Sequence, residues 1–84
     1  MFGVLTTKTF ASELKKLQKH EIKRIKEKIN DTKANPFRFF ERLSGLELYR
    51  LRIGKFRVIV SINFSLKTIT LISVGLRKKV YDNV

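Results

Sequence analysis

Residues 48–60 constrain the fold of this chain more than any other segment. Apolar and cationic residues alternate up to Ile53, Gly54 and Lys55 follow, and a β-branched run comes next. Alternation with period two predicts a strand with one buried face and one solvated face. Glycine at the first of two central positions suits a type II′ turn. We therefore expect a β-hairpin whose loop is Gly54-Lys55.

A two-residue loop would fix which residues lie opposite each other in this hairpin. Counting outward places Arg52 opposite Arg57 and Arg50 opposite Ile59, and facing residues project from the same side of a sheet. The other face would carry Tyr49, Leu51, Ile53, Phe56, Val58 and Val60. Because three guanidiniums on one face repel one another, we interpret that face as a site for a polyanion. The alternative is a solvated face with arginines chosen for solubility, although solubility alone favours mixed signs.

The net charge supports a polyanionic target. The chain has 19 Lys and Arg against 7 Asp and Glu, a net charge of +12 in 84 residues. Each half of the chain carries +6, so the charge is not confined to a tail. This balance implies a polyanionic target, an acidic partner, or both.

Length and composition predict one globular domain spanning residues 1–84. A hydrophobic content of 43% with seven phenylalanines is too rich for disorder. The absence of cysteine excludes a disulfide, a thiolate metal site and a cysteine nucleophile. The start of the sequence does not resemble a signal peptide, and no apolar run approaches the roughly 18 residues of a membrane span. We expect a cytoplasmic protein with no membrane contact.

The remaining elements follow from periodicity and from turn residues. Phe10, Leu14 and Leu17 form a helical stripe, which Thr7 or Thr9 could cap. Together with the hairpin, the pattern predicts a first strand at 2–7, helices at 8–18 and 20–34, and strands at 46–53, 56–63 and 68–74. Residues 37–43 read as an aromatic-rich connector with at most one helical turn. The order is β-α-α-β-β-β, a two-layer α+β fold. A hairpin of antiparallel helices would cover the apolar face of an antiparallel sheet and leave the arginine face open.

This layout resembles the RelE/ParE superfamily of toxins from toxin–antitoxin systems. The resemblance is carried by Leu-Ser-Gly at 43–45, by the hairpin at 49–59 and by the segment at 73–81. The RelE branch implies a ribosome-dependent endoribonuclease that cuts mRNA in the A site. The ParE branch implies a toxin that poisons DNA gyrase and lacks the ribonuclease residues.

The resemblance also implies which residues form the site, and these are Arg50, Arg52, Arg57, Arg77 and Tyr81. The pairing of Arg77 with Tyr81 favours the RelE branch. Bacterial RelE members carry lysines where Arg50 and Arg52 stand. Since arginine is a poor proton acceptor, the identity of the general base stays open.

The implied chemistry needs neither a metal nor a cofactor, because the RNA 2′-OH attacks the adjacent phosphate. The hairpin arginines would hold the backbone and stabilise the phosphorane. Arg77 would lie against the scissile phosphate. Tyr81 would act as general base, its pKa lowered by the arginines, or would stack on a base. We expect the lone His20 to have a surface or capping role, and the seven carboxylates are too scattered for a two-metal site.

Toxicity and charge together imply the partners. A RelB-like antitoxin should be acidic, disordered alone and folded on the toxin, covering the site or displacing the C-terminal segment. The ribosomal A site and mRNA would be the targets. Two other functions stay open: a ParE-like gyrase inhibitor without nuclease activity, and a non-catalytic basic module that binds RNA or the ribosome.

Overall fold

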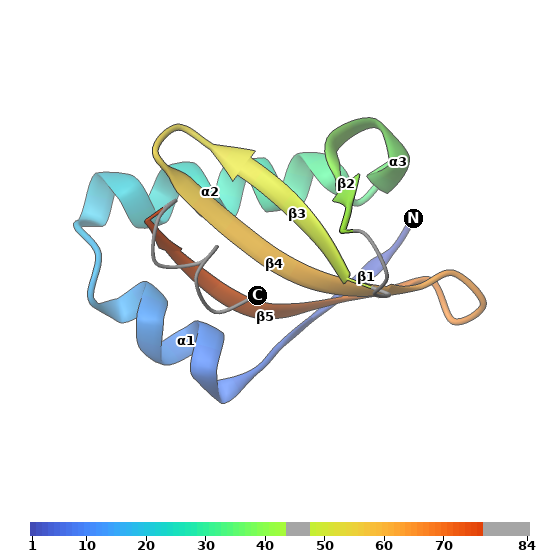
Figure 1. Cartoon of the computed structure of the whole chain (residues 1–84), viewed down its shortest axis with the longest axis horizontal. Coiled ribbons are helices and arrows are strands. Elements are labelled where there is room, and N and C mark those ends of the chain that lie inside the picture. The colour runs from blue at the N-terminus through green and yellow to red at the C-terminus, as the bar shows by residue number, and fades with distance from the viewer. Residues whose placement is uncertain (44–47, 77–84) are drawn as a thin grey trace.

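The computed structural model describes residues 1–43 and 48–76. Its elements, in chain order, are β1 (Gly3–Thr6), α1 (Lys8–Lys15), α2 (Lys19–Thr32), α3 (Pro36–Phe39), β2 (Glu41–Arg42), β3 (Leu48–Ile53), β4 (Phe56–Asn63) and β5 (Thr68–Leu76). The predicted two-layer α+β class and the predicted order of its elements are confirmed (Figure 1). The segment predicted as a connector with at most one helical turn contains the single turn α3, and the structure adds the short strand β2 to it.

The five strands form one sheet in the order β1-β5-β4-β3-β2. β3, β4 and β5 pair antiparallel, as their short connections require. β1 pairs parallel with β5, so the sheet is mixed rather than purely antiparallel. A tight turn would force two strands to be antiparallel, but β1 and β5 lie near opposite ends of the described chain and are not joined by one.

The β3–β4 hairpin has the register that the sequence predicts. Arg52 lies opposite Arg57 and Arg50 lies opposite Ile59. Gly54 has a φ of +58°, and Lys67 is the other residue with positive φ in the described ranges 1–43 and 48–76. A positive φ at only the first central residue of the loop fits the type II′ turn.

Helix α1 is fixed to β5 by two polar side chains. The hydroxyl of Thr7 caps the helix by accepting the N–H of Phe10 at 3.1 Å, and it lies 2.9 Å from the carbonyl oxygen of Leu71. A carboxylate oxygen of Glu13 accepts the N–H of Val74 at 3.1 Å. Val74 lies beyond the part of β5 that pairs with β1, so Glu13 provides the hydrogen-bond acceptor for its backbone N–H. Thr7, rather than Thr9, is therefore the cap.

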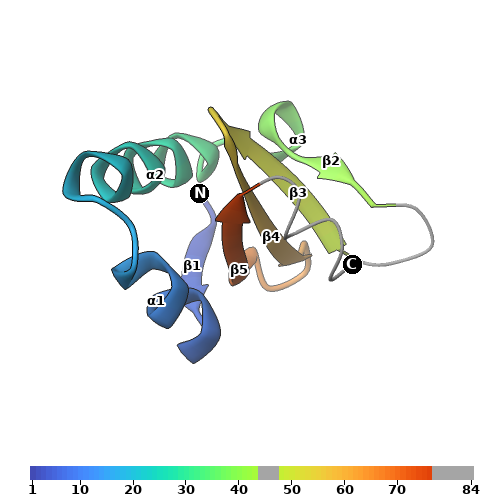
Figure 2. The same ribbon diagram turned by 60° about the vertical axis from the view of Figure 1, so that its left-hand side comes forward.

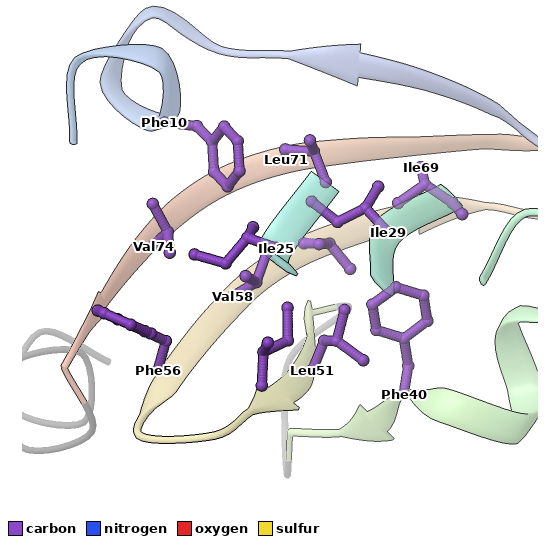
Figure 3. Packing of buried hydrophobic residues seen from close by; sticks show 12 residues of the cluster. Phe10, Ile25, Ile29, Phe40, Leu51, Phe56, Val58, Ile69, Leu71 and Val74 are labelled. Atoms are coloured by element: carbon purple, nitrogen blue, oxygen red, sulfur yellow. The ribbon is translucent and has the colours of Figure 1, made fainter. Parts of the chain in front are cut away.

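The hydrophobic core lies between the helices and one face of the sheet (Figures 2 and 3). Phe10, Ile25 and Ile29 project from α1 and α2 onto this face, and Phe40 closes the core after α3. The strands contribute Leu51, Ile53, Phe56, Val58, Val60, Ile69, Leu71 and Val74. The predicted apolar face of the hairpin is thus confirmed, with Tyr49 half-buried and packed against the core.

The two main helices are shorter than predicted and do not pack tightly together along their length. They run in opposite senses over the sheet (Figure 1). A groove of about 460 Å³ lies between them. The groove is lined by the apolar residues Val4, Phe10, Ala11, Leu14, Ile22, Ile29 and Leu71. Lys15, Lys26 and Lys33 also line it.

Candidate functional site

The three hairpin arginines lie on the sheet face that the helices do not cover. The strand register puts Arg50, Arg52 and Arg57 on the same face of the sheet. Leu51 and Val58, which are next to them in the sequence, point to the opposite face and into the core. Arg52 and Arg57 are direct cross-strand partners. We call this set the arginine cluster.

The expectation that this face is left open holds for only part of the cluster. The side chain of Arg52 is 53% exposed and that of Arg50 is 13% exposed. Arg57 is only 3% exposed, so the prediction of an open face is wrong at this position. β4 is paired on both sides, and Nη1 of Arg57 lies 3.4 Å from the carbonyl oxygen of Phe56, on its own strand.

A carboxylate that the sequence analysis did not place lies among these arginines. Glu41 on β2 is the cross-strand partner of Arg50. Nη2 of Arg50 donates to Oε2 of Glu41 at 2.8 Å, and Nε of Arg52 lies 3.3 Å from Oε1. Each carboxylate oxygen is thus paired with a different arginine. The cluster carries three cations and one anion, rather than the uncompensated cations expected from the sequence.

These contacts favour the ionised form of Glu41. The hydrogen bond from Arg50 lowers the pKa of this carboxyl below its ordinary value. Desolvation, the second-largest effect, opposes this shift, and the charges of Arg52, Arg50 and Arg57 reinforce it. Glu41, an anion at neutral pH like any exposed glutamate, therefore stays ionised to lower pH than usual.

The tip of the hairpin is held against helix α2. Glu21 Oε2 lies 3.4 Å from Lys55 Nζ. A Cβ on Gly54 would lie 2.8 Å from Nη1 of Arg24, so this guanidinium packs directly against the turn. These contacts position the end of the hairpin that carries Arg52, and the sequence pattern alone did not reveal them.

The remaining site predictions have different outcomes. Arg77 and Tyr81 lie outside the described residues, so their roles stay predictions. His20 is exposed at the start of α2, as expected for a surface residue. Within residues 1–43 and 48–76, no group of His, Asp and Glu could hold a metal ion. In the same part of the chain, no helix combines the length and apolar character needed to cross a membrane.

Comparison with known proteins identifies similar sequences. The profile of the family described as "ParE toxin of type II toxin-antitoxin system, parDE" matches residues 4–81. A protein of Methanocaldococcus jannaschii named as a candidate toxin RelE1 is 36% identical over 87 residues. That alignment covers 98% of this chain and 97% of the relative.

Solved structures show the same fold. The RelB–RelE antitoxin–toxin complex from Methanococcus jannaschii matches with a TM-score of 0.76 and 30% identity, covering 95% of this chain and 98% of the other. The archaeal RelE–RelB complex from Pyrococcus horikoshii matches with a TM-score of 0.78 and 29% identity, covering 90% and 94%. The RelBE2 complex from Mycobacterium tuberculosis has a TM-score of 0.81 at 23% identity, covering 90% and 98%, and this last likeness concerns the fold alone.

Proposed function

The chain belongs to the ParE toxin family of type II toxin–antitoxin systems, and from this premise we propose that it is a RelE-type toxin that cleaves mRNA in the ribosomal A site. The observation that carries the proposal is the arginine cluster on the sheet face away from the helices. Such a cluster can hold a phosphodiester and stabilise the charge of its pentacoordinate transition state. The relatives named RelE, at 36% and 30% identity, support this branch.

In the proposed reaction, the RNA supplies its own nucleophile. The 2′-oxygen attacks the adjacent phosphorus and the O2′–P bond forms, while the P–O5′ bond breaks. The products are a 2′,3′-cyclic phosphate and a 5′-hydroxyl. The 2′-OH proton passes to a general base, and the leaving 5′-oxygen takes up a proton from solvent. This reaction is a transesterification that requires no metal ion.

The described residues of the cluster would have distinct roles. Arg52, half exposed and one residue before the end of β3, would contact a phosphate first. Arg50 and the buried Arg57 would contribute fixed positive charge from the sheet surface, which requires little reorganisation during the reaction.

The residues expected to act on the proton lie in the C-terminal segment. Arg77 would contact the scissile phosphate, and Tyr81 would accept the 2′-OH proton or stack on a base. Nearby guanidiniums favour the phenolate and so make a tyrosine a better base near neutral pH. In-line geometry would come from the ribosome, which holds the mRNA and confines the reaction to the cytoplasm.

A reconstituted translation reaction with primer-extension mapping of the mRNA tests the proposal. We expect cleavage within the A-site codon, loss of cleavage in Arg77→Ala, and reduced cleavage in Tyr81→Phe. Lys8→Gln, on the opposite layer, is the matched control and should cleave normally. Intact mRNA under conditions where the wild-type protein binds ribosomes would contradict the proposal.

Inhibition of DNA gyrase is the second candidate function, because the matching family profile carries the name of the ParE toxin. In this case translation would proceed normally and gyrase supercoiling would stall. Salt-sensitive RNA binding with neither effect would leave only a basic RNA-binding module. A supercoiling assay run beside the translation reaction separates the three.

The proposed partner is an acidic RelB-like antitoxin. The groove between α1 and α2 has an apolar floor and several lysines in its lining, which suits an amphipathic helix with acidic flanks. A second copy of this chain fits poorly, because both copies carry +12. The similar structures from Pyrococcus and Methanococcus are complexes of RelE with RelB.

Co-expression with an acidic protein encoded beside this chain tests the antitoxin proposal. Lys26→Glu in the groove should weaken co-purification. Lys23→Glu makes the same charge change at an exposed position of α2 that does not line the groove, and it should have a smaller effect. Equal losses in both variants would show that net charge alone drives association.

A further inference from the structure

Glu41 pairs with two arginines of the cluster. Its two oxygens pair with two different arginines, Arg50 at 2.8 Å and Arg52 at 3.3 Å. The carboxylate therefore bridges adjacent outward positions of β3, and the paired Arg57 lies across from Arg52 on the same face.

A carboxylate and a phosphodiester present similar groups to arginine. Each has one negative charge shared by two terminal oxygens, and each accepts charge-assisted hydrogen bonds from guanidinium N–H groups. Glu41 is ionised at neutral pH, as an ordinary glutamate is, and its contacts with the cluster lower its pKa further. It can therefore pair with one nitrogen of each arginine in the absence of RNA.

We propose that Glu41 competes with RNA phosphates for Arg50 and Arg52 and so keeps the affinity of this toxin for free RNA low. This inference rests on the proposed function, because it assumes that the arginine cluster binds RNA. It adds an element that the proposed reaction does not require, namely a charge within the site that opposes substrate binding.

The position of Glu41 allows the competitor to leave. β2 has only two residues and lies at the edge of the sheet. The Glu41 side chain is 52% exposed, so it can rotate into solvent without disturbing the core. An incoming phosphate can then replace the carboxylate as the partner of both arginines.

The consequence concerns selectivity between free and ribosome-bound RNA. A chain with a net charge of +12 would bind cellular RNA non-specifically through its phosphates. Competition within the site lowers this background affinity. An mRNA that the ribosome already holds in position loses less entropy on binding, and so it displaces Glu41 more readily than a free strand does.

Equilibrium binding of a fluorescent ten-nucleotide 2′-O-methyl oligouridylate tests the proposal. This probe has the RNA backbone but lacks the attacking 2′-OH, so binding is measured without cleavage. Glu41→Gln should bind about threefold to tenfold more tightly than the wild type at low salt, because exposed ion pairs are individually weak. Glu13→Gln makes the same charge change on α1, where the side-chain oxygen can still accept the N–H of Val74, and it should gain less than about twofold.

Two further variants keep the outcome interpretable. Glu41→Asp retains the charge but shortens the side chain, and it should also bind the probe more tightly than the wild type. Adding Arg50→Gln to Glu41→Gln should remove most of the gain, because the contested donor is lost. Either unchanged or weaker binding by both Glu41 variants, or an equal gain in Glu13→Gln, would overturn the proposal.

The proposed function fails in a different way from this inference. If the Glu41 variants bind the probe more tightly but the wild type leaves ribosomal mRNA intact, the competition stands and the nuclease proposal falls. If mRNA is cleaved but the Glu41 variants bind no more tightly, the nuclease proposal stands and the competition falls.

Discussion

Replacing Gly54 with alanine tests whether the hairpin turn sets the geometry of the arginine cluster. Gly54 has a φ of +58°, in the region that L-residues avoid. Placing a Cβ-bearing residue there costs about 1–2 kcal/mol. The new Cβ would also lie 2.8 Å from Nη1 of Arg24. This atom is the end of a flexible side chain that can move, so we assign most of the loss to the backbone.

Gly3→Ala is a matched control, because the same substitution is made where neither constraint applies. An added Cβ at Gly3 meets nothing within 4 Å, and Gly3 does not have a positive φ. A compatible Gly→Ala change stabilises by about 0.4–1 kcal/mol through the unfolded state. The free energies of unfolding of the two variants should therefore differ by about 1.5–3 kcal/mol.

Urea denaturation followed by circular dichroism measures this difference. Gly54→Ala should remain at least about 1 kcal/mol less stable than its parent when Arg24 is also replaced by alanine, because the backbone cost persists. Equal stabilities of Gly54→Ala and Gly3→Ala would refute the argument from φ. Complete rescue by Arg24→Ala would show that the steric contact, rather than the turn, controls stability.

Three other predictions follow from the core, the cluster and the start of α2. Phe10→Ala should lose about 3–5 kcal/mol of unfolding free energy in urea, because Phe10 is 2% exposed, whereas Leu5→Ala at an exposed position should lose far less. Arg52→Gln should reduce the slope of log binding constant against log salt for single-stranded RNA by about 0.7, the value for one phosphate contact, and an unchanged slope would remove Arg52 from the interface. Glu21 accepts the N–H of Gln18 at 3.0 Å, and this bond lowers the pKa of its carboxyl below 4.5. Its ionised form therefore stabilises the fold above the unfolded pKa, and this contribution is lost as the pH falls through the lower folded pKa. Glu21→Gln should melt below the wild type at pH 7, and the two melting temperatures should converge in acid; a constant gap would contradict the assignment.

The hairpin could be predicted residue by residue because its signals are local. Alternation fixes the two faces, and the Gly54-Lys55 loop fixes the register. The observed pairing of Arg52 with Arg57 follows directly. The cap of α1 is also a local signal, and the sequence limited it to Thr7 or Thr9. The hydrogen bond from the N–H of Phe10 to the hydroxyl of Thr7 shows that Thr7 is the cap.

Contacts between distant segments could not be predicted in this way. β2 has two residues, too few for any periodic pattern, and so the pairing of Glu41 with Arg50 was missed. The parallel pairing of β1 with β5 joins the two ends of the described chain without a turn that would reveal it. The Glu13 bond to Val74 likewise depends on where α1 lies on the sheet.

Burial of a charged residue was also beyond the sequence pattern. Arg57 has the same parity as Arg52, and alternation assigns both to a solvated face. The structure buries Arg57 on a strand paired on both sides, while Arg52 remains half exposed nearer the edge of the sheet. Alternation therefore predicts the face on which each arginine lies but not how much of its side chain is exposed.

Analysis of the cleaved RNA ends is the most direct test of the central claim, that the arginine cluster promotes attack by the 2′-OH without a metal. Wild-type protein should convert ribosome-bound mRNA into fragments with 2′,3′-cyclic phosphate and 5′-hydroxyl ends, at an unchanged rate in EDTA-treated toxin, and Arg52→Gln should slow the reaction. Fragments with 3′-hydroxyl and 5′-phosphate ends, or mRNA that remains whole, would contradict it.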